Sequence, residues 1–175
     1  MSALIKQLSK YATYHRDRRN IATHFFGIPM ILVGATAFLS RPQLLEVQGL
    51  AVTPAVLVGL GAAVFYFRLD LRYGLTMLAV LAASVIAASH LAALSTAAWL
   101  AAAGGLFFVG WVIQFIGHYY EGKKPAFVDD LVGLLVGPLF VVAELGFMLG
   151  LRREVKAEVE QVAGPTRLRD LSKPA

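Results

Sequence analysis

The chain has 175 residues, of which 58% are hydrophobic and 15% charged, and its mean hydropathy is +0.67. Soluble domains are roughly 45–50% apolar and about 25% charged, so this composition indicates an integral membrane protein. The absence of cysteine excludes disulfides, thiolate metal sites and cysteine nucleophiles. The net charge of +5 gathers at the chain ends and in short loops, without a long basic stripe, so nucleic-acid binding is not expected.

The N-terminal residues 3–16 predict a short amphipathic helix. Apolar side chains recur there at steps of three and four, which is the repeat of one helical face. Lys6, Lys10 and Arg16 lie off that face. Because the segment is short and basic, we expect it to lie in the membrane interface instead of crossing the membrane.

Four apolar runs follow and predict four transmembrane helices. A span takes about 20 apolar residues, and the first run reaches that length only with Ile21 and Ala22 included. Pro29 should kink it near its start. The four runs are residues 24–39, 50–67, 73–90 and 97–117.

Lysine and arginine give the predicted orientation of these spans. The basic N-terminal segment should face the cytoplasm, because positive residues favour that side. Four crossings then place Arg68, Arg72, Lys123 and Lys124 on the same side, and the two opposite loops carry almost no positive charge. Both termini are therefore expected in the cytoplasm.

A fifth apolar run, residues 128–151, does not fit this orientation as a simple span. Crossing the membrane would move Arg152 and Arg153 to the opposite side. We therefore predict that this run turns back at Gly137-Pro138 as a re-entrant or kinked helical hairpin, since irregular backbone is tolerated at depth where protein covers it.

The predicted fold is thus an all-α integral membrane protein with four transmembrane helices, an N-terminal interfacial helix and a C-terminal hairpin. Residues 1–155 would form a single membrane-embedded domain, and residues 156–175 a charged, flexible cytoplasmic tail. The membrane would be a bacterial inner membrane, or the endoplasmic reticulum in a eukaryote. The sequence leaves open whether the chain forms a homo-oligomer.

Three of the four histidines, His15, His24 and His118, fall at the cytoplasmic edge of the predicted bundle, and His90 falls at the other. Nine residues at about 100° each place His15 and His24 on opposite faces of one helix. They can meet only if the chain bends between them, and residues 16–19 are the natural place for that bend. One histidine at a membrane edge is most often an ordinary interface residue, and that interpretation stays open.

Polar neighbours accompany two of these histidines. Asn20 would cap the helix after the bend and shares a face with His24, and Gln114, His118 and Glu121 share a face at steps of four and three. Hydrogen-bonding groups beside a histidine fix its ring orientation and tautomer, as a metal site requires. Imidazole and carboxylate without cysteine suit iron, zinc or manganese.

Other polar residues are also candidates for a role. Glu144 lies inside an apolar run, where an unpaired charge is costly, so it should face a partner, a base or a metal. Asp129 would cap the helix that follows Pro125. Lys123 and Lys124 set topology first, and they could also hold an anionic headgroup or a carboxylate.

The pattern of these residues resembles the 2-hydroxy fatty acid dioxygenase family of fatty acid α-oxidation, over almost the whole chain. That family usually places a glutamate four residues after the histidine of its Gly-His pair, whereas Glu121 here follows His118 by three. The resemblance rests on Tyr14-His15, Asn20, His24, Gly27-Ile28-Pro29, Gly110-Trp111, Gln114-Phe115, Gly117-His118, Pro125-Ala126, Asp129, Pro138 and Glu144.

The resemblance implies an Fe(II)- and O2-dependent membrane enzyme that uses no 2-oxoglutarate. It would convert a long-chain 2-hydroxy fatty acid, drawn from the membrane lipid phase, to the fatty acid one carbon shorter with release of CO2. Resemblance and position together make His15, His24 and His118 the expected iron ligands. Supporting roles are expected for Asn20, Gln114 and Asp129, catalytic roles for Glu121 and Glu144, and binding of the substrate carboxylate for Arg19, Lys123 and Lys124, beside Arg16 and Arg18.

Two alternatives remain at this stage. A membrane lipid hydrolase could hold zinc in the same histidine cluster. A small transporter or lipid-binding protein could instead use Glu144 and the histidines to relay protons. Transporters often carry two related halves with broken helices, and no such repeat is seen here.

Overall fold

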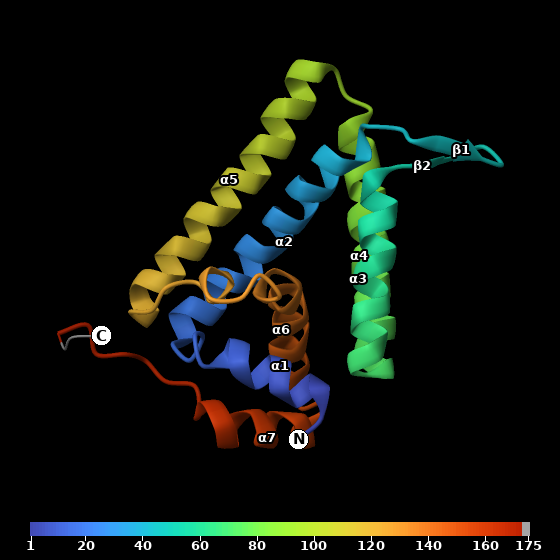
Figure 1. The fold of residues 1–175 in the computed structure, drawn as a ribbon. Coiled ribbons are helices and arrows are strands. Elements are labelled where there is room, and N and C mark those ends of the chain that lie inside the picture. Colours follow the sequence, from blue (N-terminus) through green and yellow to red (C-terminus); the bar gives the residue numbers. More distant parts are fainter. Residues whose placement is uncertain (173–175) are drawn as a thin grey trace. The chain divides into compact units, whose positions relative to one another are not determined.

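A computed structural model describes residues 1–172 and is helical apart from one short hairpin (Figure 1). The elements in chain order are α1 (Ala3–Ala12), α2 (Arg18–Ser40), β1 (Leu45–Val47), β2 (Leu50–Val52), α3 (Pro54–Leu69), α4 (Leu71–Ala92), α5 (Thr96–Glu121), the 3-10 turn η1 (Ala126–Val128), α6 (Gly133–Met148) and α7 (Arg153–Ala163). The chain divides into two compact units. The first unit comprises residues 1–28 and the chain from residue 111 onward, and the second comprises Pro29–Gly110.

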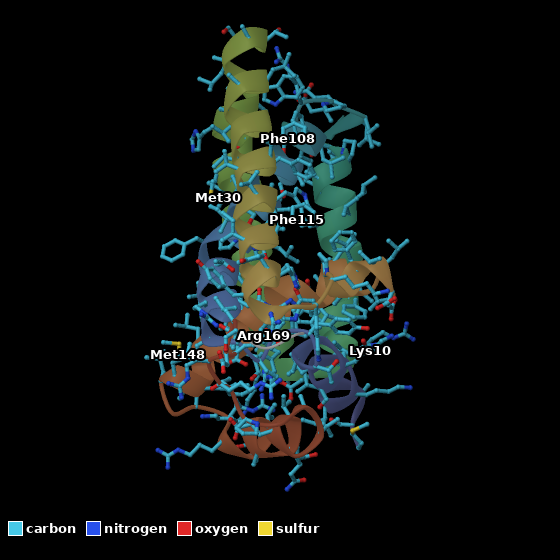
Figure 2. All side chains as sticks on the ribbon, turned by 90° about the vertical axis from the view of Figure 1, so that its left-hand side faces the viewer. Lys10, Met30, Phe108, Phe115, Met148 and Arg169 are labelled. Carbon is cyan, nitrogen blue, oxygen red and sulfur yellow. The ribbon has the colours of Figure 1, made fainter. Side chains whose placement is uncertain are left out.

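Three helices in the described chain, α2, α4 and α5, are long and apolar enough to cross a membrane. They correspond to the first, third and fourth predicted spans. α3 has 16 residues, fewer than the roughly 20 that a span takes, so the structure does not establish the predicted second span. Large apolar side chains such as Phe108, Phe115 and Met148 lie exposed on the helices, as lipid-facing side chains do (Figure 2).

The predicted second span begins too early, because residues 45–52 form a β-hairpin. β1 and β2 pair antiparallel, with Leu45 opposite Val52 and Val47 opposite Leu50. Gln48 and Gly49 connect them with φ of 51° and 80°, and two central residues with positive φ make the tight turn that matches strand twist. The helix starts only at Pro54, whose fixed φ suits a first helical turn.

The predicted turn at Gly137-Pro138 is wrong in position, because α6 continues through both residues. The break comes after Met148, where Gly150 has a φ of +75° and its N–H donates to the carbonyl of Phe147. A glycine in the left-handed region ends a helix. α6 and α7 meet there at 116°, so the C-terminal pair is bent as predicted, but about a dozen residues later.

The amphipathic helix predicted over residues 3–16 forms but ends at Ala12, and protein covers its apolar face. Leu4, Ile5 and Leu8 are buried, and α1 packs on α6 and α7. α7, which overlaps the segment predicted as a flexible tail, turns Val155 and Val159 inward. A position of α1 in the membrane interface stays a prediction.

The second unit packs through small residues. Ala37, Ala88 and Ala103 form its buried cluster, from α2, α4 and α5. A Cβ on Gly34 would lie 2.8 Å from the carbonyl oxygen of Ala103, so only glycine allows this approach of α2 to α5. Small residues at such contacts are typical of helices packed in membranes.

Candidate metal centre

Three elements of the first unit carry the histidines. His15 lies in the connection between α1 and α2, His24 lies in the second turn of α2, and His118 lies in the last turn of α5. The chain bends between His15 and His24, as their spacing required. Asp17 rather than Asn20 caps the new helix, because the Asp17 carboxylate accepts the N–H of Arg19 at 2.8 Å. The predicted cap at Asn20 is therefore wrong.

The three imidazoles lie against one another in the interior of the first unit. Their ring centroids are 4.4 Å apart for His15 and His24, 4.9 Å for His15 and His118, and 5.3 Å for His24 and His118. One nitrogen from each ring lies within 4.8 Å of the others. The residues are 0%, 2% and 7% exposed, so the cluster is shielded from solvent. Among the described residues, this is the one group of three or more histidine or carboxylate side chains close enough together to hold a metal ion.

Backbone carbonyls determine the tautomer of each ring. Because a carbonyl oxygen only accepts, each Nδ1 must carry the proton and donate it. The Nδ1-to-oxygen distances are 2.7 Å from His15 to Tyr11, 2.8 Å from His24 to Asn20, and 3.2 Å from His118 to Lys123. Each Nε2 therefore keeps a free lone pair, the form in which imidazole binds a metal.

His15 shows most clearly that the cluster fits a metal ion. Its Nε2 is buried and has no hydrogen-bond partner, an arrangement that is costly unless something binds there. Burial, and next the adjacent His24, holds the pKa of His15 well below its ordinary value, so the ring is neutral. Tyr11 stacks on it at 4.1 Å between centroids, with the rings 4° from parallel. Three neutral imidazoles suit a divalent transition metal.

Glu121 lies outside the histidine group and bonds to residues 13–18, which connect α1 to α2 and which we call the His15 loop. Its Oε2 accepts the N–H of Arg16 at 2.9 Å, the N–H of Asp17 at 2.7 Å and the Nδ2 of Asn20 at 3.1 Å. A carboxylate that satisfies three buried donors is strongly anchored. Glu121 thus contacts the residues beside the cluster and is not part of the group of three histidines.

Glu144 faces a charged partner, one of the three options that its apolar setting predicted. Its Oε1 lies 3.2 Å from Nη2 of Arg16, and both side chains are nearly buried. The Nε of Arg16 also donates to the carbonyls of Ala12 and His15 at 2.9 Å each. The ion pair therefore connects α6 to the backbone of His15 itself.

Residues 164–169, which we call the C-terminal strap, cover the same loop, and no sequence signal predicted this. The strap makes four hydrogen bonds with backbone or buried groups of the loop: Arg167 N–H to Arg16 carbonyl at 2.8 Å, Arg18 N–H to Arg167 carbonyl at 2.9 Å, Arg169 N–H to Asp17 Oδ2 at 2.7 Å, and Arg16 Nη1 to Gly164 carbonyl at 3.0 Å. Burial alone would raise the pKa of Asp17, but its bonds from Arg19 and Arg169 outweigh that effect and lower it to about 2.

Gly117 lets α2 and α5 meet beside the cluster. A Cβ there would lie 2.5 Å from Oδ1 of Asn20 and closer still to Oγ1 of Thr23. Gln114, one turn earlier on α5, is buried, and its Nε2 has no hydrogen-bond partner. Asn20 and Gln114 are thus both buried in the first unit, and their supporting roles stay predictions.

The remaining predicted residues lie at the surface and are engaged elsewhere. The side chains of Asp129 and of the cations expected to hold a carboxylate have their partners away from the histidines, although the backbone carbonyl of Lys123 accepts from His118. Their partners are Asp17 for Arg19 at 2.7 Å, the carbonyl of Thr13 for Lys123 at 2.7 Å, Asp129 for Lys124 at 2.6 Å, and Tyr14 for Asp129 at 2.7 Å. His90 is exposed on α4, in the second unit.

Comparison with known proteins gives a family for the whole arrangement. The sequence model of the family described as Mpo1-like, 2-hydroxy-palmitic acid dioxygenase, matches residues 1–149. The chain is also 31% identical over 159 residues to the 2-hydroxy-palmitic acid dioxygenase MPO1 of Saccharomyces cerevisiae. This match covers 90% of the chain and 87% of the yeast protein. No solved structure matches it. With its buried histidine cluster and its apolar helices, the chain belongs to the Mpo1-like 2-hydroxy-palmitic acid dioxygenase family.

Proposed function

We propose that the chain is an Fe(II)-dependent dioxygenase that shortens long-chain 2-hydroxy fatty acids by one carbon. In the overall reaction the 2-hydroxy acid and O2 give the shorter fatty acid, CO2 and water, which balances without a further cosubstrate. Family membership supports the reaction class. The observation that carries the assignment to a site is the set of three buried imidazoles with every Nδ1 held by a carbonyl.

The proposed ligands are the Nε2 atoms of His15, His24 and His118. A bound iron(II) ion would supply coordination positions for O2 and for the hydroxyl and carboxylate oxygens of the substrate. The protein contributes the neutral tautomers, the fixed ring orientations and the exclusion of water. Glu121 and the Arg16–Glu144 pair keep the His15 loop in register with α5 and α6.

For the substrate carboxylate we propose Lys123 among the predicted cations. Arg19 and Lys124 already pair with carboxylates, whereas the ammonium group of Lys123 donates only to the Thr13 carbonyl among the described residues. The backbone carbonyl of Lys123 accepts from Nδ1 of His118, so the ammonium group of Lys123 belongs to a residue that directly contacts the cluster. The acyl chain would lie along the apolar helices.

The test is turnover by the full-length protein, purified without oxygen in a maltoside detergent. We expect iron to copurify or to restore activity, and 2-hydroxypalmitate to give pentadecanoate with one O2 consumed per product. Palmitate serves as the matched control, since it lacks the 2-hydroxyl. Activity with zinc alone and without O2 consumption would contradict the proposal and favour the hydrolase.

A further inference from the structure

A cavity lies wholly within the second unit and plays no part in the proposed reaction. Its volume is about 380 Å³. Polar residues Arg41, Thr53 and Ser89 line it together with apolar Val56 and Val85. A cavity with both kinds of wall suits a ligand with a polar head and an apolar body.

Arg41 is held in a fixed position at this cavity. Its Nη2 donates to Oγ1 of Thr96 at 2.9 Å, and its guanidinium lies over the Trp99 ring, 4.5 Å from the centroid. The Trp99 Nε1 in turn donates to the carbonyl of Ala37 at 3.1 Å. A cation fixed by an aromatic face and a hydroxyl is preorganised for a further partner.

One donor of this guanidinium is unsatisfied. Arg41 Nη1 is buried and has no hydrogen-bond partner, and no carboxylate in the described residues 1–172 pairs with Arg41. Residues 29–110 contain just two acidic residues. Of these, Asp70 caps the start of α4, and Glu46 is exposed on the hairpin. A buried cationic donor without an acceptor calls for an anion.

The ends of membrane-length helices surround this cation. Arg41 directly follows α2, Thr96 begins α5, and Ala92 ends α4, and all three helices are candidate spans. The boundary where spans end is where phospholipid headgroups lie, and a fixed arginine matches a phosphate through its fork of N–H groups.

We propose that this cavity binds the anionic head of a membrane amphiphile, with its oxyanion on Arg41 and its chain along Val56 and Val85. The oxyanion chemistry favours the phosphate of a phospholipid, since two N–H groups of a guanidinium match two phosphate oxygens. The site would anchor lipid to the second unit, independently of the histidine cluster.

The experiment uses Trp99 as a local reporter. Trp111→Phe removes the other tryptophan, so emission from the full-length protein in a maltoside detergent reports on the ring beneath Arg41. The probes are dodecyl phosphate, dodecanoate and inorganic phosphate. We expect saturable binding of dodecyl phosphate, with inorganic phosphate at least about tenfold weaker because it lacks the chain.

Substitutions at Arg41 then test the assignment. Arg41→Met should weaken dodecyl phosphate binding by at least about tenfold, since it removes a charge-assisted pair of hydrogen bonds. Arg68→Met removes an exposed arginine of the same unit and should leave binding unchanged. Arg41→Lys keeps the charge and guards against a folding defect, and it should bind between wild type and Arg41→Met.

Each contrary result overturns a defined part of the proposal. Unchanged binding by Arg41→Met would remove Arg41 as the anion site. If inorganic phosphate bound as tightly as dodecyl phosphate, the alkyl chain would not contribute to binding. If dodecanoate bound more tightly than dodecyl phosphate, the ligand head would be a fatty acid carboxylate and not a phosphate. None of these measurements involves iron or turnover, so they succeed or fail independently of the proposed reaction.

Discussion

The two units of this chain handle polarity in opposite ways. The interior of the first unit contains most of the buried polar side chains of the described residues, including the three clustered histidines, Arg16, Asp17 and Glu144. Besides the buried Nη1 of Arg41, the second unit buries the polar residues Thr53 and Ser84, and its interior consists mainly of alanines, apolar side chains and two tyrosines. Buried charge is costly unless it is paired, and the first unit pairs nearly all of it around one cluster. The buried polar groups of the described residues thus belong mainly to the first unit, whereas large apolar side chains are exposed in both units.

The largest effect should come from removing a histidine of the cluster. We expect His118→Ala to lower iron affinity by more than about 100-fold, because partners that only orient a ligand already contribute about 10–100-fold. Metal analysis after dialysis against a graded chelator would measure this. His90→Ala, in the second unit, should bind iron like the wild type. Equal losses in both variants would erase the distinction between the units.

Breaking the buried ion pair should come next. Glu144→Leu leaves Arg16 charged and buried, which should lower the free energy of unfolding by about 3–5 kcal/mol. The double variant Arg16→Met/Glu144→Leu removes both charges and should recover much of that loss. Thermal unfolding in detergent, read by circular dichroism, would compare them. An undisturbed single variant would mean that the pair is solvated and does not hold the His15 loop.

A third test compares two glycines on the same helix. Gly117→Ala places a methyl group against Asn20 and Thr23 and should cost about 1–3 kcal/mol, with weaker metal binding. Gly105→Ala meets nothing within 4 Å and should stabilise α5 by up to about 1 kcal/mol through helix propensity. Unfolding temperature and iron content would be measured for both. Similar shifts would show that α2 and α5 are not in contact at Gly117.

The smallest effect should come from the C-terminal strap. Arg167→Pro removes the N–H that donates to the Arg16 carbonyl, whereas Arg167→Ala keeps it. We expect the proline variant to lose about 1 kcal/mol of stability and up to about tenfold in iron affinity, and the alanine variant to lose neither. Isothermal titration with iron(II) under anaerobic conditions would separate them. Identical iron titrations of the two variants would mean that the strap does not support the histidine cluster.

Local sequence patterns were sufficient for part of this structure. The three- and four-residue repeat of residues 3–16 predicted α1, which ends at Ala12, and the lengths of the apolar runs predicted α2, α4 and α5. The chemistry of the histidines and their distribution along the chain suggested that they meet. These predictions succeed because a helical face and a hydrophobic length depend on neighbouring residues alone.

Tertiary structure decided what the sequence left open. Arg16 and Glu144 are separated by 128 residues in the sequence, and Arg16 and Glu121 are separated by 105 residues. α6 ends near Gly150 and not at Gly137. Gly137 lies within α6, and its lack of a side chain leaves room for Tyr11 of α1. The contacts of the strap and the meeting of His118 with the other two histidines likewise join distant segments. Such contacts leave no periodic pattern in the sequence. Polar groups need a protein partner only after folding has removed them from water, and that partner can lie anywhere along the chain.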